Sequence, residues 1–157
     1  MNIVEIDGAT RSAVDALIRD EWAGPMIVSR GHLIDTSLNP GFVYVEQDQI
    51  KGFVTYLIRS DVCEITVLSV FDENKGIGSA LIERVIERVK EGGCVRVWLI
   101  TTNDNIHAIR FYQRRGFALA AVHINALDGA RQLKPSIPLI GMDDIPLAHE
   151  FEFEVML

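Results

Sequence analysis

The stretch with the clearest chemical potential is a glycine-containing loop between an apolar run and an amphipathic run. Two glycines one residue apart, Gly76 and Gly78, stand where the amphipathic run begins. The first N–H groups of a helix have no acceptor within the helix, and glycine lets a bulky anion approach them. The loop therefore predicts a site for a phosphate or a pyrophosphate, with Lys75 as an added positive charge. By itself, such a loop is also compatible with a purely structural turn.

Two common nucleotide-binding motifs do not fit this loop. The pattern Gly-x-x-x-x-Gly-Lys-Ser/Thr is absent, and Leu81 stands where the third glycine of a dinucleotide motif would be. A second group of residues follows downstream, on a short predicted helix and just beyond its end. This group consists of Asn105, Ala108, Phe111, Tyr112, Gly116 and Phe117.

Together, the two groups of residues resemble the GNAT acetyltransferases, the Gcn5-related superfamily. The resemblance is strong from Glu64 to Phe117, and the rest of the chain agrees with it in the order of its elements. It implies an α/β (α+β) domain whose mixed, mostly antiparallel sheet is flanked by helices and split between its two central strands. It also implies acetyl-CoA as cosubstrate, no metal, and transfer of the acetyl group to a primary amine of a small molecule or a peptide.

The resemblance assigns most contacts with the cosubstrate to the backbone. The strand before the loop would pair with the pantetheine arm, and the first turn of the following helix would hold the pyrophosphate. Asn105 would hydrogen-bond the arm, although its side chain is also a candidate helix cap. The cofactor-binding residues predicted in this way are Leu68, Ser69, Val70, Lys75, Gly76, Ile77, Gly78, Ser79, Ala80 and Asn105.

One position departs from the family pattern. Three residues before Gly76, where the family usually has Gln or Arg, this chain has Glu73. A carboxylate there would repel a phosphate. Either Glu73 turns to solvent, or the loop is shifted by one residue relative to the usual pattern.

Two residues are candidates for proton transfer. Tyr112 resembles the tyrosine that protonates the leaving thiolate of coenzyme A, and it lies about two helical turns after Asn105. A lysine-like amine, with a pKa of about 10.4, must lose a proton before it attacks a thioester. Glu64 is the first candidate for this base, directly or through water, ahead of His32 and His123. The alternative for Tyr112 is a buried core residue without a catalytic role. The alternative for Glu64 is a carboxylate at a strand end, in solvent or in a salt bridge.

Hydrophobic periodicity predicts the elements that position these residues. A strand and a helix open the chain up to Trp22, a further strand is expected at 26–34, and a hairpin follows around the turn 47–49. The loop then joins a covered strand to an amphipathic helix that ends at Gly92. The later elements are expected at 95–101 (strand), 105–115 (helix), 117–125 (strand) and 150–157 (closing strand), with parallel pairing at the core. The segment 128–138 is longer than a hairpin connection and is expected to shape a pocket, an interface or a surface loop.

Composition narrows the remaining choices. The net charge of −7 and the pI near 5.0 argue against nucleic acid as a partner. The two cysteines, Cys63 and Cys94, stand alone in apolar runs, which argues against a metal site. No signal peptide or membrane span is evident, so a cytoplasmic location without membrane contact is expected. The absence of linkers predicts one domain over 1–157, and a homodimer is compatible with the sequence.

Two other functions fit the same residues. A non-catalytic module that binds acyl-CoA as a sensor, or that binds a partner, would also need the glycine loop. A domain that binds a nucleoside triphosphate is a third possibility. An acetyltransferase is the leading hypothesis because only this function uses both Asn105 and Tyr112.

Overall fold

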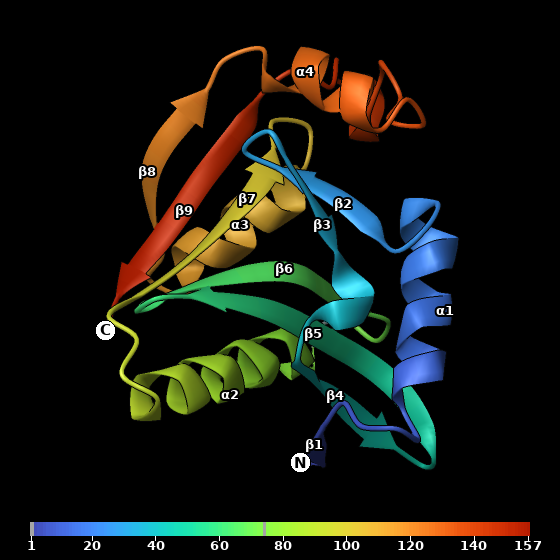
Figure 1. Ribbon diagram of the computed structural model, residues 1–157, viewed down its shortest axis with the longest axis vertical. Helices are drawn as coiled ribbons and strands as arrows, with labels where there is room; N and C mark the ends of the chain where they lie inside the picture. The colour runs from blue at the N-terminus through green and yellow to red at the C-terminus, as the bar shows by residue number, and fades with distance from the viewer. Residues whose placement is uncertain (1, 74) are drawn as a thin grey trace.

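The alternating apolar and polar residues of the chain form a seven-stranded sheet (Figure 1). The computed structural model describes residues 2–73 and 75–157. All neighbouring strands are antiparallel except β6 and β7, which are parallel, so the mixed, mostly antiparallel sheet expected from the sequence is confirmed. Side by side, the strands are β1 (Ile3–Glu5), β4 (Gly41–Glu46), β5 (Gln49–Arg59), β6 (Val62–Val70), β7 (Arg96–Thr102), β9 (Glu150–Met156) and β8 (Ala118–His123).

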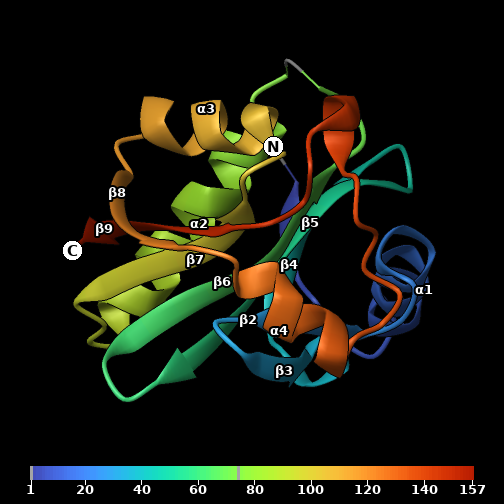
Figure 2. The ribbon, with the colours of Figure 1, turned by 90° about the horizontal axis from the view of Figure 1, so that it is seen from above.

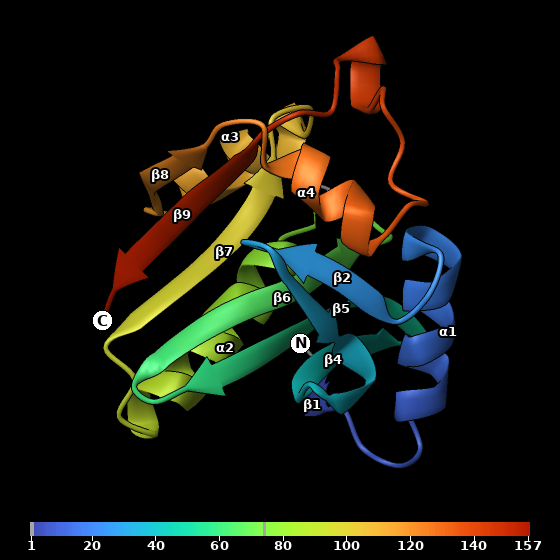
Figure 3. The same ribbon diagram turned by 45° about the horizontal axis from the view of Figure 1, so that its top comes forward.

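The sheet is split between its two parallel strands. β6 and β7 are paired only from Val62–Arg96 to Ile65–Leu99, although both strands continue beyond this point. Figures 1 and 3 show the two strands meeting at their N-terminal ends and then diverging. Beyond Ile65, the edge of β6 that faces β7 therefore lacks a neighbouring strand, and alternate N–H and C=O groups of this edge are open to another partner.

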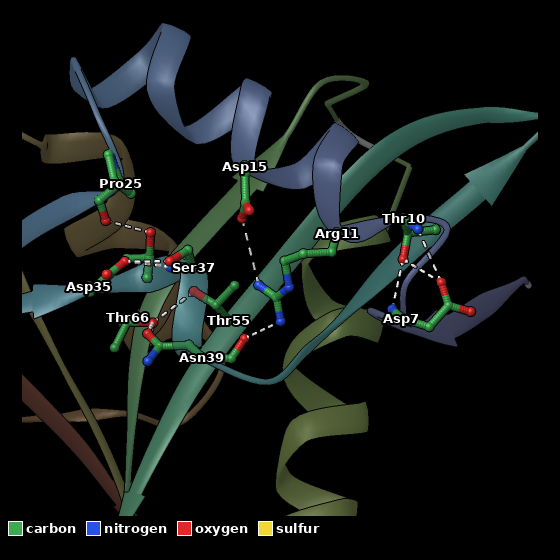
Figure 4. Close-up of polar contacts among 11 residues, drawn as sticks. Asp7, Thr10, Arg11, Asp15, Pro25, Asp35, Ser37, Asn39, Thr55 and Thr66 are labelled. Atoms are coloured by element: carbon green, nitrogen blue, oxygen red, sulfur yellow. Dashed lines mark hydrogen bonds and ion pairs between the residues drawn. The ribbon is translucent and has the colours of Figure 1, made fainter.

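A β-bulge in β6 lies where the split begins. Thr55 pairs with Val67 and the next residue of β5 pairs with Ile65, so Thr66 is an extra residue on β6. Polar contacts hold it: the Thr66 hydroxyl lies 2.7 Å from that of Thr55 and donates to Oδ1 of the buried Asn39 at 2.8 Å (Figure 4). Arg11 in turn binds the carbonyl of Asn39. The bulge shifts the alternation of β6, so that Glu64 shares a face with Ser69 and not, as expected from strict alternation, with Leu68.

Helices cover both faces of the sheet (Figure 2). One core lies under α2 and α3 and contains Leu81, Val85 and Phe153. The second core lies under α1 and contains Val14 and Ile18, packed against Phe53 and Val67. Among the residues that the structure describes, no helix combines the length and the apolar character needed to span a bilayer. The helices are α1 (Arg11–Trp22), α2 (Ile77–Glu91), α3 (Ile106–Arg114) and α4 (Ala126–Leu133), with short 3-10 turns η1 (Thr36–Leu38) and η2 (Met142–Asp144).

Three segments differ from the sequence-based expectation. Residues 26–34 form a hairpin of β2 (Met26–Ser29) and β3 (His32–Asp35), because Arg30 and Gly31 have φ angles of 49° and 77° and reverse the chain. β8 pairs antiparallel with β9, which is inserted between β7 and β8, so the core has one parallel pair only. The segment 128–138, expected to shape a pocket, an interface or a surface loop, begins within helix α4. This helix packs near the β2–β3 hairpin (Figure 3).

Candidate functional site

A groove of about 610 Å³ lies where the end of β6, the start of α2 and α3 come together. It follows directly from the split in the sheet, because β6 has no neighbouring strand there. The groove brings together residues that are distant in the sequence. The predicted site residues that line it are Leu68, Ser69, Val70, Gly76, Ile77, Gly78, Asn105 and Tyr112.

The start of α2, where the glycine loop predicts an anion site, lies at the groove. Gly76 has a φ of 74°, which a residue with a side chain rarely adopts, and no side chain caps the helix. The first bond of the helical ladder is donated by Ala80 to the carbonyl of Gly76, so the N–H groups of Ile77 and Gly78 precede the ladder. Because Ile77 and Gly78 line the groove, their amides are candidate anion donors, whereas the Ala80 amide is already used within the helix.

Gly78 has a second, structural reason to be glycine. A Cβ at this position would lie 2.9 Å from Cε2 and Cζ of the Phe111 ring. The absence of a side chain therefore lets α3 approach the start of α2. The same two residues line the groove, so this close contact lies in its wall.

The positive charges near the anion site differ from those expected. Lys75, the expected charge, lies 2.8 Å from Asp72 and forms an ion pair with it. Arg115, which follows α3, donates from Nε to the hydroxyl of Ser79 at 2.6 Å and stacks on the Phe111 ring. Ser79 is therefore a contact of Arg115, and Arg115 brings its charge to the first turn of α2.

Asn105 and Tyr112 both reach the groove from α3. Oδ1 of Asn105 accepts the Ala108 N–H at 3.0 Å, so the side chain caps the helix while it also lines the groove. The Tyr112 ring packs against Phe117 and Phe153 in the core. Burial raises the pKa of Tyr112, and the nearby charge of Arg115 offsets this only in part. The hydroxyl of Tyr112 therefore stays protonated and can act as a proton donor.

Glu64 lies outside the groove. It is 4% exposed, and its Oε2 accepts the Ser29 hydroxyl at 2.6 Å. Burial raises the pKa of Glu64, opposed by the hydrogen bond from Ser29 and by the charge of Arg59. Its side chain borders a separate small cavity of about 30 Å³ together with Trp98. The structure thus places Glu64 in the paired part of β6, before the point where β6 and β7 separate.

Several groove residues were not identified from the sequence. Three of them, His107, Arg110 and Arg114, follow the three- and four-residue spacing of one helix face, which could have indicated a basic wall on α3. Glu73, the carboxylate that departs from the family pattern, lines the same groove as Arg110 and Arg114. Glu21 reaches the groove from α1, far away in the sequence, and no sequence motif indicates it.

His123, a weaker base candidate, belongs to an ion-pair network away from the groove. Its Nε2 lies 3.1 Å from Glu152, which also binds Arg96 at 2.6 Å and Arg30 at 3.5 Å. Burial alone would raise the pKa of Glu152, but the hydrogen bonds from Arg96 and His123 outweigh it, and the pKa lies below its ordinary value. The network fastens the β2–β3 hairpin to β9. His32, the other weak candidate, is exposed at the start of β3.

This network makes the fold sensitive to acid. A carboxylate with a lowered pKa stabilises the fold above its unfolded pKa of about 4.3, and this contribution is lost as the pH falls through the folded pKa. We expect Glu152→Gln to lower the free energy of unfolding at pH 7 by about 1.5–3 kcal/mol, the range for hydrogen bonds to a charged group, and to flatten its fall in acid. The measurement is urea unfolding between pH 7 and pH 3. Glu154→Gln, on the same strand face but more exposed, is the control and should cost less than about 1 kcal/mol.

Comparison with known proteins agrees with this geometry. Residues 12–117 match the model of the Acetyltransferase (GNAT) family. The uncharacterized protein YxbD of Bacillus subtilis is 39% identical over 151 residues, which cover 96% of this chain and 95% of that protein. The uncharacterized protein YdhI of the same organism is 44% identical over 138 residues, which cover 87% and 86%. The crystal structure of a Bacillus subtilis acetyltransferase in complex with CoA superposes with a TM-score of 0.70, at 21% identity, over 99% of this chain and 97% of that one. By its sequence and its fold, this chain belongs to the GNAT acetyltransferase family.

Proposed function

We propose that the chain is an acetyl-CoA-dependent N-acetyltransferase that transfers an acetyl group directly to a primary amine. The observation that carries this proposal is the groove, where an open strand edge, free helix amides and Tyr112 lie together. An anion-binding turn alone would serve many ligands. The combination fits a ligand with a pyrophosphate, an extended amide-containing arm and a reactive end.

The groove residues fit acetyl-CoA, which supplies an activated acetyl thioester. The free edge of β6 near Leu68 and Val70 can hydrogen-bond the pantetheine arm in the way that a peptide strand adds to a sheet edge. The amides of Ile77 and Gly78 suit the pyrophosphate, and the cations of α3 suit the remaining phosphate charge. The acetyltransferase of similar fold that binds CoA supports this assignment.

The reaction needs two proton transfers, and each is assigned to a different residue. The neutral amine attacks the thioester carbonyl carbon, so that a C–N bond forms and the C–S bond breaks. Tyr112 donates its proton to the departing thiolate. Glu64 takes the proton that the amine must lose, through water, because its carboxylate lies outside the groove. A backbone N–H of β6 near Leu68 or Ser69 is the candidate donor to the oxyanion.

The raised pKa of Glu64 predicts a pH dependence. Because burial raises this pKa, kcat/KM for an amine should rise with pH through a value above the ordinary range of glutamate, as Glu64 becomes the carboxylate. Glu64→Gln should remove this rise and lower kcat/KM at least tenfold. The measurement is a pH–rate profile with acetyl-CoA. His123→Gln is the control and should keep the rise; a profile that changes with His123 and not with Glu64 would assign the base to the histidine.

The proposal is tested by following free thiol release from acetyl-CoA across amines, amino acids, aminoglycosides and peptides. Release that depends on the acceptor supports the enzyme. A non-catalytic acyl-CoA-binding module would bind acetyl-CoA in calorimetry but leave every acceptor unchanged. Stronger thermal stabilisation by ATP than by coenzyme A would favour a nucleotide-binding domain instead.

A further inference from the structure

One of the carboxylates that line the groove, Glu21, is held by a hydrogen bond and has no role in the acetyl transfer described above. Glu21 lies in the last turn of α1 and lines the groove together with Ser69. The hydroxyl of Ser69, a residue only 5% exposed, donates to Oε2 of Glu21 at 2.7 Å. A buried residue of the central strand thus orients this carboxylate on the groove wall.

Glu21 has no cationic partner among the residues that the structure describes. Asp72, another carboxylate of the groove, is paired with Lys75. Lys134 approaches the end of α1, but its Nζ donates to the carbonyls of Trp22 and Met26. Glu21 is therefore an oriented negative charge beside a large groove, with its Oε1 open to a hydrogen-bond donor.

The position of Glu21 separates it from the phosphate-binding amides. Ser69 pairs with Phe53, whose ring packs in the core under α1, so the two side chains share the α1 face of the sheet. The Ile77 and Gly78 amides belong to α2, on the opposite face. Glu64 lies on the α1 face, as Ser69 does, because of the bulge at Thr66. Glu21 and the proposed base therefore lie on the same face of the sheet, opposite to α2.

We infer that Glu21 binds an ammonium group of the acceptor, and that this ammonium is distinct from the amine that is acetylated. The inference rests on the proposed acetyl transfer. The reacting nitrogen gives up its proton to Glu64 before it attacks, whereas the nitrogen held by Glu21 stays protonated, so the two are different nitrogens of one acceptor. The acceptor is therefore a diamine or polyamine. Met142, which is 54% exposed and also lines the groove, offers an apolar contact to the methylene chain between its nitrogens.

The test compares 1,4-diaminobutane with butylamine, which has the same carbon chain and lacks the second charge. After correction for the two equivalent amines, the wild-type protein should prefer the diamine at least about fivefold in kcat/KM. Glu21→Gln should reduce this preference to about one, mainly through KM for the diamine. Asp20→Asn, the neighbouring carboxylate on α1 outside the groove, is the matched control and should keep the preference.

Calorimetry separates this inference from the proposed function. The protein loaded with coenzyme A should bind 1,4-diaminobutane more tightly than butylamine, and only the Glu21 variant should lose the difference. If this binding is seen without any turnover, the enzyme proposal fails and the ammonium site stands. If both amines bind and react equally well, or if Glu21→Gln keeps the preference for the diamine, the ammonium site is wrong whatever the turnover.

Discussion

Replacing Tyr112 with phenylalanine should lower kcat by about a hundredfold and leave the affinity for acetyl-CoA nearly unchanged. General acid catalysis contributes about 10²–10⁴-fold, and phenylalanine cannot donate a proton to the thiolate. The ring would still fill the space between Phe117 and Phe153. Burial and the charge of Arg115 are what shift the pKa of Tyr112, and no hydrogen bond to its hydroxyl contributes, so the fold should lose little stability. Steady-state kinetics and acetyl-CoA calorimetry measure the two effects separately.

Tyr56→Phe is the matched control for this variant. Tyr56 is also buried, at 5% exposed, but it lies in the core under α2 and outside the groove. Its loss of a hydroxyl should change kcat less than twofold. If Tyr112→Phe turns over as fast as the wild type, Tyr112 is a core residue only and another group, or water, protonates the thiolate.

Replacing Gly78 with alanine should weaken acetyl-CoA binding at least tenfold. The new Cβ would lie 2.9 Å from two atoms of the Phe111 ring, so the ring must move. Phe111 carries the stacked Arg115, which donates to Ser79, so the movement also displaces the charge at the start of α2. Overpacking of this kind costs about 1–3 kcal/mol of stability. Calorimetry with acetyl-CoA and urea unfolding measure the two losses.

Gly129→Ala is the control for this variant. Gly129 also lies in a helix, α4, but a Cβ there would meet nothing within 4 Å. This change should leave acetyl-CoA binding intact and raise stability by about 0.5–1 kcal/mol, because alanine favours the helix over glycine. If Gly78→Ala binds acetyl-CoA as tightly as the wild type, the Phe111 ring moves without weakening binding. The close contact then does not determine the shape of the cofactor site.

Local patterns in the sequence determined the elements nearest to the site. Alternating apolar residues predict the β4–β5 hairpin, and the stripe from Ile77 to Val89 predicts α2, because each pattern matches the period of its element. The glycine pair and the spacing between Asn105 and Tyr112 also led to eight of the residues that line the groove. These features depend on residues that are close together in the sequence, so the sequence alone is sufficient to predict them.

The remaining features of the fold depend on contacts between segments that are distant in the sequence. The place of β9 between β7 and β8 depends on which strand edges are free once the chain has folded, and no local pattern encodes it. The bulge at Thr66 depends on Thr55 and Asn39, and it moved Ser69 onto the face of Glu64.

The residues of the site can likewise be separated into those that the sequence predicts and those that only the folded structure brings together. The glycine loop and Tyr112 could be found from sequence because short spacing defines them. The Ser79–Arg115 and Ser69–Glu21 contacts join residues 36 and 48 positions apart, so only the folded chain brings them together. The sequence by itself thus predicted where a cofactor with phosphates would bind. The tertiary structure decided which charges surround it, because electrostatic interactions depend on distance in space and not on distance along the chain.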